Sequence, residues 1–272
     1  MKMKKLTAAL TAALVLGTTL VFAGCSSDKG TTSNESTASD IQKIKDAGVF
    51  KVGVKVDVPK YGLKNTTTGE VEGLEVDIAK AVSKKIFGDE NKIETTAVTA
   101  KTRGPLLDNG EIDAVIATFT ITDERKQSYN FSDPYFTDGV GLLVKKSLGA
   151  KELKDLDGKT IGVAQSSTTK KALEDEAAKE GITLKFSEFG SYPEISAALD
   201  SGRIDCFSVD ASILNGYLSD SKEILDFRTN PQEYGIATKK SNEGLAKLVN
   251  EVVAEMKSSG ELDKLIAKWE IK

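Results

Sequence analysis

Four polar side chains that follow a short apolar run carry the clearest chemistry in this sequence. Residues 113–117 are predicted to form a short buried strand, and the chain leaves it through Thr118, Thr120, Thr122 and Arg125. Ligands of open α/β sheets bind beyond the carboxyl ends of the strands, so these side chains would line a crevice. Hydroxyls, backbone N–H groups and a guanidinium fork together suit a small anion such as a carboxylate.

A repeated segment indicates that the chain contains two similar lobes. The pattern L-D-x-G-x-I-D occurs at 107–113 and again at 199–205, and the second copy leads into an apolar strand that ends at Asp210. In each copy the glycine is expected to end a helix, and a strand begins almost at once. We therefore expect two α/β lobes whose strand ends face one shared cleft.

Further candidates lie at predicted strand ends and helix starts on the same side. Thr168 belongs to a hydroxyl-rich helix start, which is a typical anion site. Arg103 comes just before a helix that Pro105 would open. The remaining candidates are Lys55 and Tyr61 after a strand at 50–54, Tyr192 at the start of another helix, and Tyr234 in a strand that crosses between the lobes.

Each of these residues also has a purely structural interpretation. Arg125 has helix neighbours, Asp123 and Glu124, with which it could form a salt bridge. Asp210 could serve only as a helix N-cap, a position that Asp favours. In the same way Lys55 could be a solvated strand-end lysine, Arg103 a surface arginine, and Tyr61 and Tyr192 core packing residues.

Composition excludes several function classes. The chain has 272 residues with 39% hydrophobic content, a formal net charge of −4 and no histidine. Without histidine there is no Ser-His chemistry and no ordinary zinc site. An acidic chain does not suit nucleic acid. We predict no catalytic residue, no metal and no cofactor, and we expect Cys206 to be a small buried core residue.

The amino terminus has the features of a lipoprotein leader. Basic residues, an apolar stretch and then Ala23-Gly24-Cys25 predict a signal peptide over 1–24, with Cys25 as the lipidated residue. An ordinary signal peptide or a membrane anchor would also fit the apolar stretch. Residues 25–40 are rich in Ser and Thr and are expected to form a flexible tether that joins the protein to the membrane.

The globular part is predicted to be α/β, with two mixed sheets flanked by helices. We assign 41–136 with 237–272 to the first lobe and 140–231 to the second. The hinges are expected near 135–141 and 229–236. The apolar spacing of the last helices predicts that they pack on the first lobe.

Four motifs make the chain from about 41 to 272 resemble the bacterial extracellular solute-binding proteins, family 3, of polar amino-acid ABC transporters. The motifs are EGLEVDIAKAV, ATFTITDERKQSYNFSDPYF, GVAQSSTTKKAL and QEYGIATKK. This resemblance implies a two-lobed periplasmic-binding-protein fold of type II, an extracytoplasmic monomer, and permease subunits as partners. It also implies that Thr120 and Arg125 hold the ligand α-carboxylate, assisted by Thr118 and Thr168, while Asp210 binds the α-ammonium.

Within the family the sequence looks closest to the aspartate/glutamate-binding branch. The matching positions are Lys55, Arg103, Tyr192 and Tyr234. If Arg125 and Asp210 serve the α-groups, Lys55 and Arg103 are left as unpaired cations facing the ligand side chain, and a carboxylate would compensate them. We therefore expect glutamate or aspartate. Glutamine or another polar amino acid is the alternative ligand, and a periplasmic dehydratase-type enzyme on the same fold is the alternative in a different class.

The lipidation hypothesis predicts that Cys25→Ser abolishes membrane attachment. Stable anchoring of a protein by lipid needs more than one acyl chain, and all of them would be lost with the cysteine. Fractionation of cells that make the variant should place the processed protein in the soluble fraction. A processed Cys25→Ser protein that stays in the membrane fraction would contradict lipid anchoring.

Overall fold

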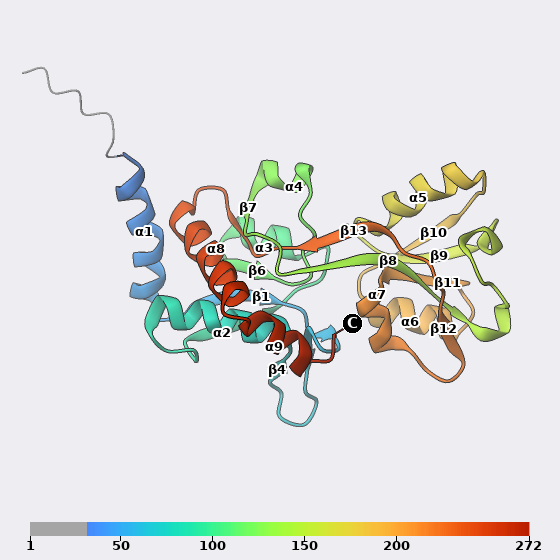
Figure 1. Cartoon of the computed structure of the whole chain (residues 1–272), viewed down its shortest axis with the longest axis horizontal. Helices are drawn as coiled ribbons and strands as arrows, with labels where there is room; N and C mark the ends of the chain where they lie inside the picture. Colours follow the sequence, from blue (N-terminus) through green and yellow to red (C-terminus); the bar gives the residue numbers. More distant parts are fainter. Residues whose placement is uncertain (1–31, 272) are drawn as a thin grey trace, which may run out of the picture.

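The computed structural model describes residues 32–271, which form two lobes, each built on its own sheet (Figure 1). The first sheet has the strand order β5-β1-β6-β14-β7. Its strands are β5 (Ile93–Ala97), β1 (Phe50–Val54), β6 (Ala114–Ile116), β14 (Ala237–Lys239) and β7 (Tyr129–Phe131). β1 is parallel to β5 and β6, whereas β14 runs antiparallel to β6 and β7.

The second sheet repeats this plan. Its order is β10-β9-β11-β8-β12, with β13 pairing to β8. The strands are β10 (Lys185–Phe189), β9 (Thr160–Ala164), β11 (Cys206–Asp210), β8 (Phe136–Lys145), β12 (Lys222–Ile224) and β13 (Thr229–Tyr234). In both sheets the first strand lies between two parallel neighbours, and an antiparallel strand follows. The predicted fold class, two mixed sheets flanked by helices, is confirmed.

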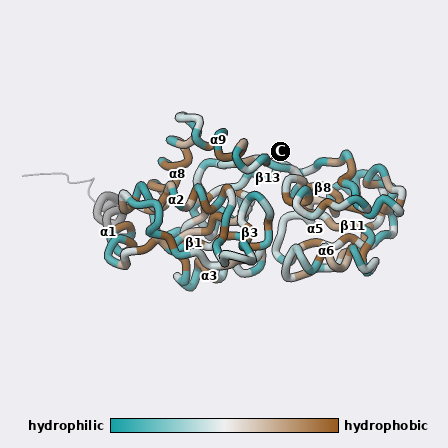
Figure 2. The backbone as a smooth tube through the Cα atoms, turned by 90° about the horizontal axis from the view of Figure 1, so that it is seen from below, coloured by the Kyte–Doolittle hydropathy of each residue, from teal (hydrophilic) through white to brown (hydrophobic). Residues whose placement is uncertain are grey.

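Helices cover both sheets. The first lobe carries α1 (Thr32–Ala47), α2 (Leu74–Phe87), α3 (Arg103–Asn109), α4 (Asp123–Ser128), α8 (Glu243–Ser258) and α9 (Glu261–Lys268), and a small sheet of β2 (Asp57–Val58), β3 (Gly62–Lys64) and β4 (Val71–Glu72). The second lobe carries α5 (Thr169–Glu180), α6 (Tyr192–Asp200) and α7 (Ala211–Leu214), with short 3₁₀ turns at Lys146–Leu148, Leu153–Leu156 and Asn215–Tyr217. Figure 2 shows the same division from a second direction.

The helices pack through apolar stripes at helical spacing. The buried face of α2 includes Val76, Ala79, Val82 and Ile86, as an amphipathic helix requires. The C-terminal helices bury Leu245, Val249, Val252, Val253, Met256 and Leu262 in the core that they share with β1 and α2. The last helices therefore pack on the first lobe, and burial of this stripe is the main force that holds them there.

Two antiparallel strands connect the lobes. β8 pairs with β13 from Phe136↔Tyr234 to Val140↔Thr229, and both strands run from one half of the molecule to the other (Figure 1). β8 then continues into the second sheet as a partner of β11. The lobe limits predicted from the sequence, 41–136 with 237–272 and 140–231, stay predictions.

The repeated segment has the same structural role in both lobes. Gly110 ends α3 and Gly202 follows α6, each in the left-handed region that glycine tolerates. The aspartate that closes each copy accepts a backbone N–H from the neighbouring strand. Asp113 Oδ2 lies 2.8 Å from Lys51 N, and Asp205 Oδ2 lies 2.9 Å from Thr160 N. Each aspartate thus fixes where its parallel strand pair begins.

The expected tether is wrong over part of its length, because residues 32–40 belong to α1. Ile44 of this helix is buried against the core, and Asp40 Oδ2 accepts the N–H of Leu245 at 3.1 Å. These contacts hold the second half of α1 in place, and adding residues to an existing helix costs far less free energy than starting a new one. Ser and Thr lower the stability of a helix only slightly per residue. The predicted signal peptide and Cys25 lie outside the described residues. Among residues 32–271, no helix is long and apolar enough to cross a membrane.

Removing either aspartate of the repeat should destabilise the fold. Asp113→Ala and Asp205→Ala each leave a half-buried backbone N–H without its partner, which costs about 1–2 kcal/mol of unfolding free energy. Urea unfolding followed by circular dichroism measures this loss. Asp220→Ala, at an exposed position, is the matched control and should change nothing. Equal stability of all three variants would contradict the shared role.

Candidate functional site

The structure brings most of the predicted site residues together between the lobes. The first lobe and the connecting strands supply Lys55, Tyr61, Arg103, Thr118, Thr120 and Tyr234, and the second lobe supplies Tyr192 and Asp210. All eight are buried. Arg125 and Thr168 are half-buried, and each makes a contact outside its own lobe: Arg125 donates to Ser166 O, and Thr168 donates to Gln232 of β13.

Arg125 links the two lobes through its guanidinium. Nη1 donates to Thr120 O at 2.8 Å within the first lobe, and Nη2 donates to Ser166 O at 3.1 Å in the second lobe. Burial, together with the positive charge of the nearby Arg103, lowers the pKa of Arg125 to about 9. Among the described residues it forms no ion pair with Asp123 or Glu124, so the helix-face alternative does not hold.

Hydroxyls from the two lobes meet at one acceptor that the sequence analysis missed. Thr120 Oγ1 and Thr168 Oγ1 lie 2.8 Å and 2.6 Å from Oε1 of Gln232, a fully buried residue of β13. Gln232 Nε2 donates to Asn230 O at 2.8 Å, which fixes the orientation of the amide. The available signal was its position two residues before Tyr234 in a strand, since alternate residues share one face.

Asp210 is a buried carboxylate at the end of β11. It is the N-cap residue of α7, but its side chain makes no capping hydrogen bond and instead accepts the O–H of Tyr234. The capping alternative therefore does not hold. Burial raises the pKa of Asp210 to about 7, although the Tyr234 hydrogen bond acts in the opposite direction. The second carboxylate oxygen is suited to an ammonium group.

Lys55 is neither solvated nor unpaired. Its side chain is 2% exposed, and Nζ lies 2.9 Å from Oδ1 of Asp57 and 3.4 Å from Val98 O. Nζ also lies 4.6 Å from the ring centroid of Tyr192 in the second lobe. Burial lowers the pKa of Lys55, and Asp57 counteracts this shift. The premise that Lys55 is a free cation awaiting a ligand carboxylate is therefore wrong.

Glu75 and Arg103 hold the same peptide segment from opposite sides. Arg103 Nη1 donates to Ala117 O at 2.7 Å and to Thr118 O at 2.9 Å, and the guanidinium stacks on Phe119. Glu75 Oε1 accepts the N–H of Thr118. Thr118 has φ 44°, a left-handed conformation that costs energy for a threonine and needs such support. Arg103 is thus a buried residue and not a surface arginine.

Glu75 is the second functional residue that the sequence analysis missed. Its side chain is fully buried, and Oε1 also accepts the O–H of Tyr135 at 2.6 Å, while Oε2 has no partner among the described residues. Burial raises the pKa of Glu75, whereas its two donors and the charges of Lys55 and Arg103 lower it. The signal was its spacing on α2: Glu75 falls on the apolar stripe of Ile78, Ala79 and Val82.

The cations of the site therefore have negative partners within the protein. From the sequence alone, Lys55, Arg103 and Arg125 are three cations against a single acid, Asp210. The structure adds Asp57 beside Lys55 and Glu75 near Arg103, so both of these cations already have a carboxylate of the protein close to them. Compensation of an excess positive charge was the argument for an acidic ligand, and that argument loses its basis.

Tyr61 and Tyr192 pack where the two lobes meet. Tyr61 packs edge-on against Phe136 and Tyr234, and its hydroxyl lies 2.8 Å from Oγ of Ser212 in the second lobe. Tyr192 packs near Phe207 and presents its ring to Lys55. Both residues combine core packing with contacts across the lobes.

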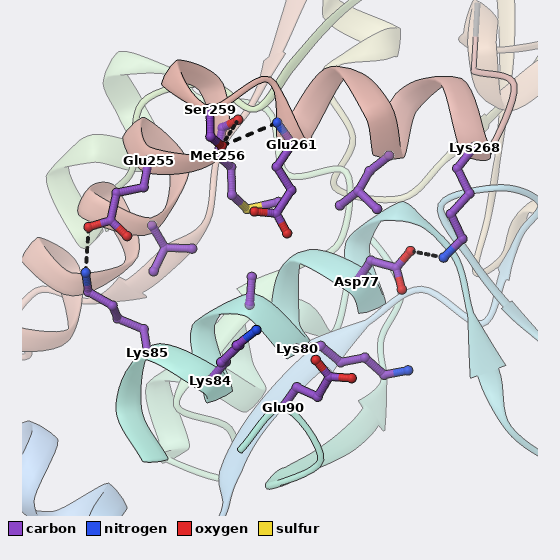
Figure 3. Close-up of a pocket in the computed structure, with 13 residues that line it drawn as sticks. Asp77, Lys80, Lys84, Lys85, Glu90, Glu255, Met256, Ser259, Glu261 and Lys268 are labelled. Atoms are coloured by element: carbon purple, nitrogen blue, oxygen red, sulfur yellow. Dashed lines mark hydrogen bonds and ion pairs between the residues drawn. The ribbon is translucent and has the colours of Figure 1, made fainter. Parts of the chain in front are cut away.

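A groove of about 720 Å³ between α2 and the C-terminal helices contains none of these residues (Figure 3). Two ion pairs lie in it, Lys85 with Glu255 at 2.5 Å and Lys268 with Asp77 at 2.7 Å. Such solvent-exposed pairs stabilise little, and the groove also carries both positive and negative side chains outside these pairs, so it has no excess charge of one sign to attract a ligand. The residues at 32–271 contain no cluster of metal-ligating side chains.

The sequence matches a family model and several known proteins. The model described as bacterial extracellular solute-binding proteins, family 3, matches residues 50–272. A glutamine-binding protein of an ABC transporter in Bacillus subtilis (strain 168) is 39% identical over 255 residues, which cover 92% of each chain. A glutamine-binding protein of Geobacillus stearothermophilus is 42% identical over 83% of this chain and 89% of its own. An L-glutamate/L-aspartate-binding protein of Pseudomonas aeruginosa is 28% identical over 84% of this chain and 79% of its own.

A solved structure shows the same fold with an amino acid bound. It is described as an ancestral arginine-binding protein bound to glutamine, and it is 35% identical with a TM-score of 0.74. The match covers 83% of this chain and 99% of that one.

The expected role of Asp210 makes affinity dependent on pH. Only the ionised carboxylate can bind an ammonium, so protons compete with the ligand below the pKa of about 7. We expect affinity to be constant above pH 8 and to fall by about tenfold per pH unit below the pKa. Isothermal titration calorimetry with the best-bound amino acid between pH 8.5 and 5.5 measures this.

Tyr234→Phe provides the matched test. Loss of the O–H donor removes an interaction that stabilises ionised Asp210, so the decline should begin at higher pH in the variant. Affinity that does not change with pH in either protein would exclude Asp210 as the ammonium partner.

Proposed function

The chain belongs to the bacterial extracellular solute-binding proteins, family 3, and on that premise we propose that it binds glutamine and delivers it to the permease of an ABC importer. Like its relatives, the protein is an amino-acid-binding component of an importer, and it is not an enzyme.

The internal partners of Lys55 and Arg103 carry the choice of glutamine. Lys55 is paired with Asp57, and Arg103 lies beside the buried Glu75, so a neutral side chain needs no counter-charge. A carboxylate side chain would bring a second negative charge toward Glu75, and a guanidinium side chain would face Lys55 and Arg103. Burying an uncompensated charge is costly, which disfavours both. Two relatives of 39% and 42% identity are described as glutamine-binding proteins, which supports the same choice.

Thr120, Thr168 and Arg125 are proposed to bind the α-carboxylate, and Asp210 the α-ammonium. Support comes from their convergence: hydroxyls from both lobes meet at Gln232, and Arg125 reaches from the first lobe to the second. A ligand held by groups from both lobes favours the arrangement in which the lobes touch. Binding by closure of the cleft follows from this.

Attachment to the cell surface through a lipid on Cys25 completes the proposal. The family is extracellular or periplasmic, and the Ala23-Gly24-Cys25 boundary supports an anchor. Thr118, Tyr61, Tyr192 and Tyr234 are proposed to shape the site around the ligand.

Calorimetry of the purified protein against glutamine, glutamate, aspartate and arginine tests the ligand. We expect glutamine to bind more tightly than the other three by about tenfold or more. Arg125→Ala should weaken every ligand by about ten- to a hundredfold, since charge-assisted hydrogen bonds to the α-carboxylate are lost.

Arg203→Ala removes an exposed arginine of the second lobe and should leave all affinities unchanged. Tighter binding of glutamate, aspartate or arginine than of glutamine would refute the proposed ligand. An Arg125→Ala variant with normal affinity would refute the carboxylate site.

A further inference from the structure

Glu75 is a carboxylate without contact to solvent in the part of the protein where the lobes meet. It is fully buried at the start of α2, and its Oε1 accepts hydrogen bonds from Thr118 N and Tyr135 Oη. Its Oε2 is buried without a partner among the described residues. A buried carboxylate is retained in a fold at a cost, so its charge needs an explanation beyond packing.

Glu75 lies close to the predicted ligand-binding residues of the first lobe. The N–H of Thr118 donates to Glu75 and its carbonyl oxygen accepts from Arg103, so one residue separates the carboxylate from the guanidinium. Arg103 was expected to face the ligand side chain as an unpaired cation. Because Glu75 is hydrogen-bonded to the same residue as Arg103, its negative charge offsets much of the positive potential of Arg103.

We propose that Glu75 is the specificity-determining residue of the site: two hydrogen-bond donors and the nearby cations Lys55 and Arg103 hold it ionised, and its buried negative charge offsets that of Arg103, so the cleft favours a carboxamide side chain over a carboxylate. This inference rests on the proposed function, because it presumes that glutamine is the ligand. Glu75 acts through the electrostatic field and through Thr118, and it is not assigned a contact with the ligand.

Ligand size does not distinguish glutamine from glutamate, because their side chains have the same shape. The two differ by one negative charge and by two N–H donors. Selection between them therefore depends on the charge of the surroundings, and a buried charge acts more strongly than an exposed one because water does not screen it. Among the acids near Lys55 and Arg103, Glu75 is the one with no exposed surface.

Glu75→Gln is the direct test, with calorimetry against glutamine and glutamate. The amide oxygen of the substituted side chain can still accept from Thr118 and Tyr135, so the local hydrogen bonds remain. Removal of the charge leaves Arg103 uncompensated. The ratio of the dissociation constants, glutamate over glutamine, should fall by about tenfold or more relative to the wild type. A purely structural role would change both affinities and leave this ratio unaltered.

Two further variants serve as controls. Glu75→Asp keeps the charge and should keep the wild-type ratio even if both affinities decline. Glu72→Gln removes an exposed charge from β4, in the same segment, and should change neither affinity. Circular dichroism and thermal melting check that each variant is folded.

Arg103→Gln provides an independent test should Glu75→Gln fail to fold. It removes the cation and leaves Glu75 uncompensated, so the ratio should rise by about tenfold. An unchanged ratio in folded Glu75→Gln, or in Arg103→Gln when Glu75→Gln does not fold, overturns the inference. Tighter binding of glutamate by the wild type refutes the proposed ligand instead, so the two failures are distinguishable.

Discussion

Burial of charge between two surfaces is the constraint on which the site depends. Lys55, Arg103, Glu75 and Asp210 have lost nearly all contact with solvent, and ions in such surroundings must be paired or hydrogen-bonded. The fold meets this requirement in three ways. Lys55 is paired with an aspartate, Arg103 donates to two carbonyl oxygens, and Asp210 accepts from a tyrosine. What remains available for a ligand is set by these internal pairings and not by the number of charged residues.

The duplicated lobe plan explains how so many polar groups reach one place. In each sheet a first strand lies between two parallel neighbours, and the aspartate that closes the repeated segment fixes the start of the pair. Parallel strands then end at the same edge, where Thr118 follows β6 and Ser166 follows β9. Both residues adopt left-handed backbone conformations, which turn the chain sharply. Ser166 O accepts from Arg125 of the first lobe, whereas the N–H and C=O of Thr118 are bonded within their own lobe.

Much of this could be predicted from the sequence, since strand ends and helix starts are local features. The repeat predicted two lobes, and the T-x-T-x-x-R run placed Thr120 and Arg125 at a strand end. The number of free charges could not be predicted that way, because it depends on contacts between distant segments. Asp57 lies two residues from Lys55, yet nothing local shows that the two side chains pair. Glu75 meets Thr118 across 43 positions, and Gln232 meets Thr120 across 112.

Helix α1 is an element whose first turns could not be predicted from the sequence. Its first residues have the composition of a tether, and local sequence gives no reason for a helix there. The cause lies in the contact of Ile44 and Asp40 with the first lobe, where α8 is packed. A long-range contact thus decided a local conformation, as it did for the charge balance of the cleft.

The ribbon formed by β8 and β13 has a mechanical consequence. A single connecting strand would let one lobe twist and swing about the other in every direction. Two strands held side by side by backbone hydrogen bonds, from Phe136↔Tyr234 to Val140↔Thr229, resist twisting and bend easily only across their plane. Relative motion of the lobes is thereby reduced to nearly one coordinate. Little rotational freedom is left for a ligand to remove, so the two halves of the site arrive in register each time they meet.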